Sequence, residues 1–385
     1  MSVETVSLGC RLNFAEAETI ARSVPTGEKW IVVNSCAVTN EAVRHTRQAI
    51  RRAHRRRPDA RILVTGCAAE LDKAGFERMP EVARVAANRN KLQAFGGRTS
   101  VAAGSHSRVR SFVAVQNGCD HRCTFCSIWQ ARGPSMSLPF EGIRDAAAQE
   151  IDRGAKEIVL TGVDITDYDG GLGELCQRLL AAEPRLKRLR LSSLDSIEID
   201  EAFFELLSDP RIMPHFHLSL QAGDDMILKR MKRRHSRAQA VDLVSRLKAL
   251  RPDIAIGADL IAGFPTEDAA MFANTLALID DCAIALAHIF PYSPRAGTPA
   301  ARMPQVARDA VKARAARLRE AAAQRKAAWL QEQIGTVQQV LVELDGRSGH
   351  AANFARVTFP AAQPNSIQRM TLSAVNGNEL VGVAA

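Results

Sequence analysis

Three cysteines stand at a close spacing, C-x-x-x-C-x-x-C, within the segment GCDHRCTFCSIW. They are Cys119, Cys123 and Cys126, called the loop cysteines below. A 4Fe–4S cluster normally takes four cysteine thiolates, so three thiolates leave one iron without a protein ligand. A metal with an open coordination position is suited to chemistry rather than to structural support. The spacing therefore predicts a catalytic iron–sulfur cluster.

Two other uses of these cysteines fit the sequence less well. Structural zinc takes four ligands, and although His121 lies inside the loop, no second cysteine or histidine pair follows at zinc-finger spacing. A disulfide needs an oxidising compartment, and the N-terminus MSVETVSLGC lacks the basic and apolar regions of a signal peptide. The loop resembles the signature of radical S-adenosylmethionine (SAM) enzymes. That resemblance implies an open iron that binds SAM, whose reductive cleavage yields a 5′-deoxyadenosyl radical.

A second set of cysteines shares one local context near the N-terminus. Cys10, Cys36 and Cys67, called the N-terminal cysteines below, close the apolar runs VETVSLGC, WIVVNSC and RILVTGC. Such runs, separated by helical patterns, predict buried strands of a parallel sheet. Ligands of open α/β sheets bind beyond the carboxyl ends of the strands. We therefore expect these side chains to converge on a second cluster, with Gly9 and Gly66 letting the backbone turn close to it.

The alternative for the N-terminal cysteines is a structural role, because free cysteine is among the most buried residue types. Three cysteines at equivalent strand ends favour the cluster instead. Cys176 and Cys282 lack such partners, and we expect both to be core residues.

From about residue 110 to residue 300, short apolar runs alternate with amphipathic helical stretches such as 138–154 and 236–250. This alternation predicts a parallel barrel or partial barrel with its site at the carboxyl ends of the strands. Polar residues follow those runs and together offer partners for the ribose, adenine and methionyl groups of SAM. The predicted cofactor contacts are Thr161, Gly162, Asp164, Ser193, Asp195, Gln221 and Asp259.

One predicted helix near the N-terminus is strongly basic. Thr39 or Asn40 can cap its start and Pro58 marks its end. Acidic residues are nearly absent from this stretch, so phosphate contact is one interpretation and a solvated face is the other. Its arginines are Arg44, Arg47, Arg51, Arg52, Arg55, Arg56 and Arg57.

The last part of the chain changes character twice. After Pro304 a long helical stretch continues to Gly335 and is expected to pack outside the barrel. The following segment has short-strand character, which predicts a small β-barrel. Acidic and basic residues roughly balance there, so charge alone does not support an RNA-binding role for this segment.

Chain length and net charge limit the number of domains and the class of partner that the sequence allows. A chain of 385 residues suits two or three domains. We predict an α/β class: an open parallel α/β domain at 1–100, a radical SAM partial barrel with its outer helix at 108–334, and the small β-barrel at 335–385. The net charge of +9 favours an anionic partner such as RNA. No stretch approaches the ~20 apolar residues of a membrane span, so we expect no membrane partner. Eight cysteines without a secretory signal are typical of reduced thiols or metal ligands, so we expect a cytoplasmic protein. We also expect a monomer.

With these features in order, the sequence resembles the methylthiotransferases of the radical SAM superfamily over nearly its full length. The matching segments are SLGC, VNSCAVT, VTGCAA, QNGCDHRCTFC, HFHLSLQAGDDMILKRMKRRHS, GADLIAGFPTED and HIFPYSPRAGTPAARMP. The resemblance implies an N-terminal α/β domain, a radical SAM partial barrel and a C-terminal TRAM domain.

The segments HFHLSLQAGDD and HIFPYSPRAGTPAARM are most similar to the branch that acts on threonylcarbamoyladenosine. The implied reaction is 2-methylthiolation of that nucleoside at position 37 of tRNA, with the anticodon stem-loop as partner and an electron donor. The resemblance assigns the loop cysteines to the 4Fe–4S cluster that cleaves SAM, with the radical taking hydrogen from adenine C2. It assigns the N-terminal cysteines to an auxiliary 4Fe–4S cluster that presents sulfur. One SAM would supply the methyl group and a second the radical.

The chain departs from the family pattern just after the cysteine loop. Where members commonly have an Ile-Pro pair and later a Ser-Arg element, this chain has Ser127–Gln130 and Ser135–Ser137. The departure bears on substrate preference more than on reaction class. The alternatives are methylthiolation of isopentenyladenosine in tRNA or of a ribosomal-protein aspartate. From another class, the alternative is a non-catalytic RNA-binding protein that holds an iron–sulfur cluster or zinc.

Overall fold

The computed structural model describes residues 3–95, 102–103 and 109–385. Its first unit is a parallel sheet with the strand order β1-β2-β3-β4. The strands are β1 (Val3–Ser7), β2 (Trp30–Ser35), β3 (Arg61–Gly66) and β4 (Arg84–Val85). The elements between and after them are α1 (Arg11–Arg22), α2 (Asn40–Arg56), α3 (Cys67–Leu71), α4 (Lys73–Glu77) and the 3-10 helix η1 (Asn88–Gln93).

Apolar residues on both faces explain why these strands lie in the centre of the unit. Ile31 and Val33 pack on one face of β2, and Trp30 and Val32 pack on the other. Near-continuous apolar runs are typical of strands covered on both sides. The Thr39 side chain accepts a hydrogen bond from the Ala42 amide at 3.1 Å, so α2 begins at the predicted cap.

The second unit is an open barrel of parallel strands. They are β6 (Arg110–Ala114), β9 (Glu157–Thr161), β10 (Leu189–Leu191), β11 (His215–Gln221), β12 (Ala255–Ala262) and β13 (Ile284–Pro291). A β-bridge between Leu194 and Leu218 joins the sheet containing β10 to the sheet containing β11. At the other edge, β5 (Ala102–Ala103) pairs antiparallel with β6. The larger helices are α6 (Phe140–Asp152), α7 (Leu172–Ala182), α10 (Arg237–Leu250) and α11 (Ala269–Asp281).

Shorter elements shape the loops of this barrel. They are β7 (Gln116–Asn117), α5 (Ile128–Arg132), β8 (Met136–Ser137), η2 (Ile165–Asp167), α8 (Glu201–Glu205), η3 (Leu206–Ser208), α9 (Asp225–Met231) and η4 (Pro299–Arg302). The barrel core lies between the strands and the outer helices and includes Cys176 and Cys282, as predicted for both.

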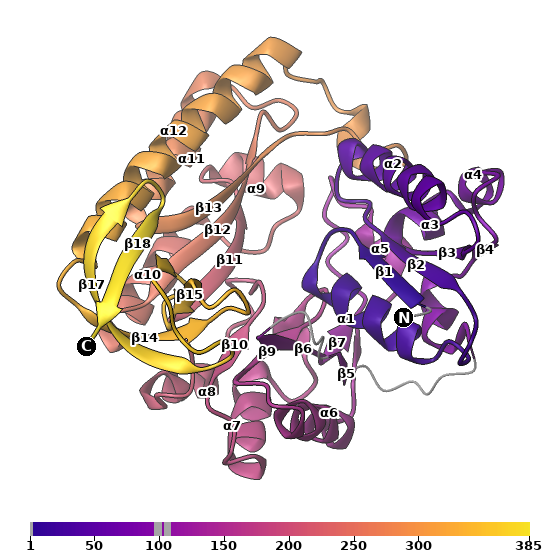
Figure 1. Cartoon of the computed structure of the whole chain (residues 1–385). Coiled ribbons are helices and arrows are strands. Elements are labelled where there is room, and N and C mark those ends of the chain that lie inside the picture. Colours follow the sequence, from indigo (N-terminus) through magenta and orange to yellow (C-terminus); the bar gives the residue numbers. More distant parts are fainter. Residues whose placement is uncertain (1–2, 96–101, 104–108) are drawn as a thin grey trace.

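The third unit follows a long helix, α12 (Arg308–Glu332), which packs on β13 outside the barrel. It is a closed five-stranded barrel with the order β14-β15-β16-β18-β17. Its strands are β14 (Val337–Val342), β15 (Ser348–Ala351), β16 (Arg356–Thr358), β17 (Ile367–Asn376) and β18 (Glu379–Ala384). Figure 1 shows the indigo N-terminal unit on one side of the parallel strands and the yellow closed barrel on the other.

The predicted α/β class with an open sheet, a partial barrel and a small closed barrel is confirmed. The predicted domain limits remain predictions, and residues 100 and 108 at the first boundary lie outside the described part of the chain. Within the described ranges, no helix combines the length and the apolar character that a membrane crossing needs.

Candidate functional site

The N-terminal cysteines lie at one edge of the first sheet. Cys36 directly follows β2, Cys67 directly follows β3, and Cys10 is the N-cap of α1 just after β1. The register pairs Ser7 with Asn34 and Ser35 with Gly66, so the strands end nearly level. Burial raises the pKa of Cys36 to about 11, and the charges of Cys67 and Cys10 contribute in the same direction. The three thiols are therefore electrostatic neighbours.

Two glycines make room for this arrangement. Gly9 has a φ of +101°, and a Cβ there would lie 2.8 Å from the Cys36 sulfur. Gly66 has a φ of +95°, and a Cβ there would lie 2.5 Å from the Ser35 amide nitrogen. A side chain at either position would combine an unfavourable φ with a steric clash.

A buried ion cluster contacts the N-terminal cysteines from the segment that follows the cysteine loop. Arg132, the last residue of α5, donates from Nε to the Cys67 sulfur at 3.3 Å. Its Nη1 lies 2.5 Å from Glu16 Oε1, and the Lys91 Nζ lies 2.5 Å from Glu16 Oε2. All three charged side chains are at most 3% exposed. Two cations thus face one carboxylate, and the surplus positive charge adjoins Cys67.

The loop cysteines are held by backbone contacts at the mouth of the partial barrel. The Cys119 amide donates to the Gly133 carbonyl at 3.1 Å, and the Thr124 amide donates to the Met231 carbonyl at 3.0 Å. Burial raises the pKa of Cys119 to about 11 and that of Cys126 to about 12. Burial also acts to raise the pKa of Cys123, but a hydrogen bond from His121 and the Arg233 charge lower it overall.

His121 is surrounded by carboxylates. Its Nε2 lies 3.0 Å from Asp164 Oδ2 and 3.2 Å from Glu198 Oε1, and its Nδ1 lies 3.2 Å from Asp195 Oδ2. Although burial opposes the charged form, these hydrogen bonds raise the pKa of His121 far above its ordinary value, so the ring carries a proton. Arg233 links the group to the loop, because its Nη2 lies 2.8 Å from Asp195 and its Nη1 3.7 Å from the Cys123 sulfur.

Arg295 connects the two cysteine sets. It is 8% exposed and donates from Nη1 to Asn40 Oδ1 at 2.6 Å. Burial lowers the pKa of Arg295, while the thiolates of Cys36 and Cys126 act in the opposite direction. Thiols of both sets therefore act on the charge of one guanidinium.

The donor chemistry at both sets fits anionic iron–sulfur clusters. Hydrogen bonds to sulfur and nearby positive charge stabilise thiolate ligands and tune such clusters. N–H donors reach sulfurs of both sets: Cys36 accepts from Val38 N, Cys67 from Arg132 Nε, Cys123 from Arg233 Nη1 and Cys126 from Ile128 N. The role of the six cysteines as ligands remains a prediction.

The residues predicted to contact SAM occupy different environments. Asp164 and Asp195 lie beside His121, and Thr161 is buried at the end of β9. A Cβ on Gly162 would lie 2.8 Å from the Gln116 carbonyl oxygen, Ser193 is exposed, and Gln221 has a φ of +66° at the end of β11.

Asp259 does not lie where the sequence led us to expect it, at the carboxyl end of a strand. It lies inside β12 rather than at its carboxyl end, and Oδ1 is 3.0 Å from His217 Nε2 and 3.2 Å from His288 Nδ1. These histidines act against the effect of burial and lower the pKa of Asp259 below its usual range. Its side chain is therefore engaged on the inner face of the barrel.

Several residues of the site were not predicted from the sequence. Gln116 accepts the Val163 and Asp164 amides through Oε1 at 3.1 and 2.8 Å, which orients the loop after β9. Arg132 and Arg233 contact cysteine sulfurs. The sequence analysis did not single out Arg132, although an arginine six positions after Cys126 is a local feature that could have identified it. Of the departures from the family pattern, Trp129 packs under Arg122 and Met136 is 58% exposed.

The basic helix α2 is only partly available to an external anion. Arg52 and Arg55 are exposed. Four of its arginines and the C-cap Arg57 pair with carboxylates of this chain: Arg44 with Glu41, Arg47 with Asp72, Arg51 with Glu81, and Arg56 and Arg57 with Glu4. The geometry therefore does not favour phosphate binding by all seven of these arginines.

Two protein families match this chain. Residues 113–279 match the Radical SAM superfamily, and residues 2–87 match the family described as Uncharacterized protein family UPF0004. The first range contains the loop cysteines and the second contains the N-terminal cysteines. The radical SAM match implies SAM and a 4Fe–4S cluster as cofactors.

Curated relatives match most of the chain. The Threonylcarbamoyladenosine tRNA methylthiotransferase MtaB of Rickettsia prowazekii (strain Madrid E) is 42% identical over 381 residues, covering 92% of this chain and 90% of the relative. The protein of the same name from Thermotoga maritima is 33% identical, covering 78% and 77%. The tRNA-2-methylthio-N(6)-dimethylallyladenosine synthase of Erythrobacter litoralis (strain HTCC2594) is 31% identical, covering 89% and 86%.

A solved structure shares the fold. The radical S-adenosylmethionine methyltransferase TsrM from Kitasatospora setae, with cobalamin and a 4Fe–4S cluster bound, has a TM-score of 0.55 and 15% sequence identity. The match covers 78% of this chain and 77% of that one. At this identity the likeness concerns the fold alone.

Proposed function

This chain belongs to the radical SAM tRNA methylthiotransferases, and from that premise we propose that it adds a 2-methylthio group to N6-threonylcarbamoyladenosine at position 37 of tRNA. The observation that carries the proposal is the pair of three-cysteine sets, linked by Arg132, which ends the helix after the cysteine loop and donates to the Cys67 sulfur. The name of the relative at 42% identity supports the choice of nucleoside.

The six cysteines would hold two clusters. The loop cysteines would bind the cluster that works with SAM, and the N-terminal cysteines would bind the auxiliary one. When bound, the first cluster supplies the electron for reductive cleavage of SAM and the second supplies the sulfur. An unactivated aromatic C–H bond offers no acid or base handle, so the reaction needs both clusters close to one carbon.

The chain's own residues position and charge-balance this site. Arg132 and Arg233 donate to Cys67 and Cys123, so each fixes a sulfur and offsets thiolate charge. Arg295 acts on both sets and lowers the electrostatic cost of bringing them together. The burial of Cys36, Cys67 and Cys123 keeps water from those sulfurs.

The strand ends beside His121 are the proposed border of the SAM site. Thr161 ends β9, Gly162 and Asp164 follow it, and Ser193 and Asp195 follow β10. Asp164 and Asp195 hold His121, and His121 in turn lies against the loop cysteines, so these carboxylates orient the loop as well. Gln221 and Asp259 continue the same inner surface along β11 and β12.

The anticodon stem-loop of tRNA is the proposed macromolecular partner, and the net charge of +9 suits it. We further propose a monomer that works in the cytoplasm with an external electron donor. The organisation proposed for it is an auxiliary-cluster domain at 1–100, a radical SAM domain at 108–334 and a TRAM-like domain at 335–385.

Nucleoside mass spectrometry tests the substrate directly. The gene is expressed in cells that lack their own tRNA methylthiotransferases, and total tRNA nucleosides are compared with cells that carry the loop-cysteine triple alanine variant. A new 2-methylthio form of threonylcarbamoyladenosine alone supports the proposal. A methylthio group on isopentenyladenosine, or on a ribosomal-protein aspartate with no change in tRNA, would replace the substrate with one of the alternatives.

Anaerobic reconstitution separates the enzyme from a non-catalytic metal-binding protein. Two 4Fe–4S clusters correspond to about eight irons per chain, and SAM with a reductant should yield 5′-deoxyadenosine. The loop-cysteine triple alanine variant should retain about four irons on the N-terminal cysteines. One tightly held zinc and intact SAM would overturn the assignment.

A further inference from the structure

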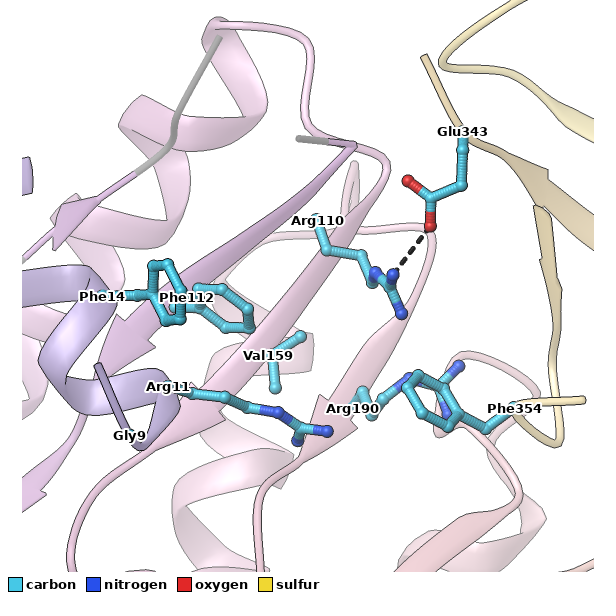
Figure 2. Close-up of a pocket in the computed structure, with 9 residues that line it drawn as sticks. All are labelled: Gly9, Arg11, Phe14, Arg110, Phe112, Val159, Arg190, Glu343 and Phe354. Carbon is cyan, nitrogen blue, oxygen red and sulfur yellow. Dashed lines mark hydrogen bonds and ion pairs between the residues drawn. The ribbon is translucent and has the colours of Figure 1, made fainter. Parts of the chain in front are cut away.

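A cavity of about 250 Å³ lies where the three units of the chain meet. Figure 2 shows Arg11 from the start of α1, Arg110 and Arg190 from β6 and β10, and Glu343 and Phe354 from the closed barrel around one space. Residues distant in sequence therefore line it together, and three of them are arginines.

The positive charge around this cavity exceeds the negative charge. Arg110 lies 2.7 Å from Glu343, and Arg190 and Arg188 lie 2.6 and 3.6 Å from Glu157. With Arg11 this makes four guanidiniums against two carboxylates, a surplus of two positive charges. Burial lowers the pKa of Arg11 to about 10, and the charges of Arg190 and Arg110 act in the same direction.

Buried donors in this group lack acceptors. Arg190 is 1% exposed, yet in the described part of the chain its Nη1 has no hydrogen-bond partner. Arg11 is partly exposed, and among the described residues it makes one long hydrogen bond of 3.4 Å, from Nη1 to the Leu191 carbonyl. Leaving a buried charged donor unpaired is costly. The arrangement is therefore incomplete without an anion.

Phe354 forms one wall of the cavity. The guanidinium carbons of Arg190, Arg110 and Arg11 lie 4.8, 5.3 and 5.9 Å from its ring centre. His215 stacks on the ring at 4.9 Å. The ring gathers the three guanidiniums along one wall of the cavity (Figure 2).

The cavity borders the N-terminal cysteines. Gly9 is among its lining residues, Cys10 follows Gly9 directly, and a Cβ on Gly9 would lie 2.8 Å from the Cys36 sulfur. A nucleoside whose base lies near these sulfurs could therefore extend a substituent into the cavity.

We propose that this cavity binds the carboxylate of the threonylcarbamoyl group, an inference that rests on the proposed function. Arginine forks match carboxylates geometrically and pair with them in charge-assisted hydrogen bonds. An apolar dimethylallyl group would leave the same arginine donors without an acceptor. The cavity therefore favours threonylcarbamoyladenosine through new hydrogen bonds and disfavours dimethylallyladenosine through unpaired donors. Arg11 is the main discriminating residue, because Arg110 and Arg190 already have carboxylate partners.

Binding of two stem-loop RNAs tests this inference without turnover. One RNA carries threonylcarbamoyladenosine and the other carries plain adenosine at the same position, and fluorescence anisotropy gives Kd for the cluster-loaded protein without SAM. The wild type should prefer the modified RNA by about tenfold, as expected for a hydrogen bond to a charged group. Arg11→Gln should lose that preference while binding the plain RNA as before, and Arg11→Lys should keep part of it. Arg319→Gln, an exposed arginine of α12, is the matched control for the loss of one charge.

The other source of the same chemistry is an RNA phosphate. If Arg11→Gln weakens both RNAs by the same factor, the cavity binds backbone phosphate and the inference is overturned. An unchanged preference in Arg11→Gln overturns it as well. If the wild type binds neither RNA, the proposed function falls and the inference falls with it.

Discussion

Replacing Arg132 by glutamine should weaken the first unit of the fold by about 3 kcal/mol. Removing one partner of a buried ion pair typically costs about 3–5 kcal/mol, because the other charge stays buried without compensation. The Lys91 Nζ stays 2.5 Å from Glu16, so part of the compensation survives and the lower end of that range applies. The predicted loss corresponds to roughly a hundredfold change in an opening equilibrium.

Hydrogen exchange measures this loss where it occurs. Peptides from β2 and β3 report the opening of the first sheet, and peptides from β14 serve as an internal control. The change in β2 and β3 should appear as about a hundredfold faster exchange, with no change in β14. Iron content measured on the same samples shows whether Cys67 still holds its metal.

A double-mutant cycle with Glu16→Gln identifies the cause. Because Glu16 and Arg132 interact directly, the double variant should lose less than the sum of the single variants, with a coupling of about 2 kcal/mol. A coupling below about 0.5 kcal/mol would refute the reasoning that the buried pair carries the stability.

Three further predictions follow from single sites. Burial opposes the charge of Glu157, but Arg190 and Arg188 lower its pKa from 4.5 to about 2. The ionised carboxylate therefore contributes about 3 kcal/mol to the free energy of unfolding above pH 4.5, and this contribution is lost as the pH falls toward 2. Glu157→Gln should flatten that part of a curve of stability against pH, and an unchanged slope would contradict the prediction. A Cβ on Gly118 would lie 1.7 Å from the Pro134 carbonyl oxygen, whereas Gly133 has a similar φ and no atom within 4 Å of its Cβ position. After reconstitution, the Gly118→Ala variant should therefore hold less iron than the Gly133→Ala variant. Equal iron contents in the two variants would speak against a steric cause. Arg233→Met removes a donor to Cys123 and should lower the reduction potential of the loop cluster by tens of millivolts in an EPR titration. Arg319→Met, at an exposed position of α12, is the control.

The sequence alone was sufficient to predict most of the elements of the fold, and it indicated which cysteines to group into two sets. The α/β class, the start of α2 at Thr39 and the core positions of Cys176 and Cys282 agree with the structure. These features depend on local patterns: apolar runs, a capping side chain and the spacing of residues within one segment. The same patterns predicted the cysteine sets, since strand ends and a short loop are visible in a linear sequence.

Only the tertiary structure identified the charges around those cysteines. Glu16 and Arg132 are 116 positions apart, and the fold decides whether they meet. The sequence also led us to expect Asp259 at a strand end, whereas the strand β12 continues past it and histidines from β11 and β13 engage it. The cavity with Arg11, Arg110 and Arg190 depends on the packing of all three units. Ligand type is a local property of the chain, but electrostatic balance in a buried site is summed over every element packed around it, so it becomes readable only in the folded molecule.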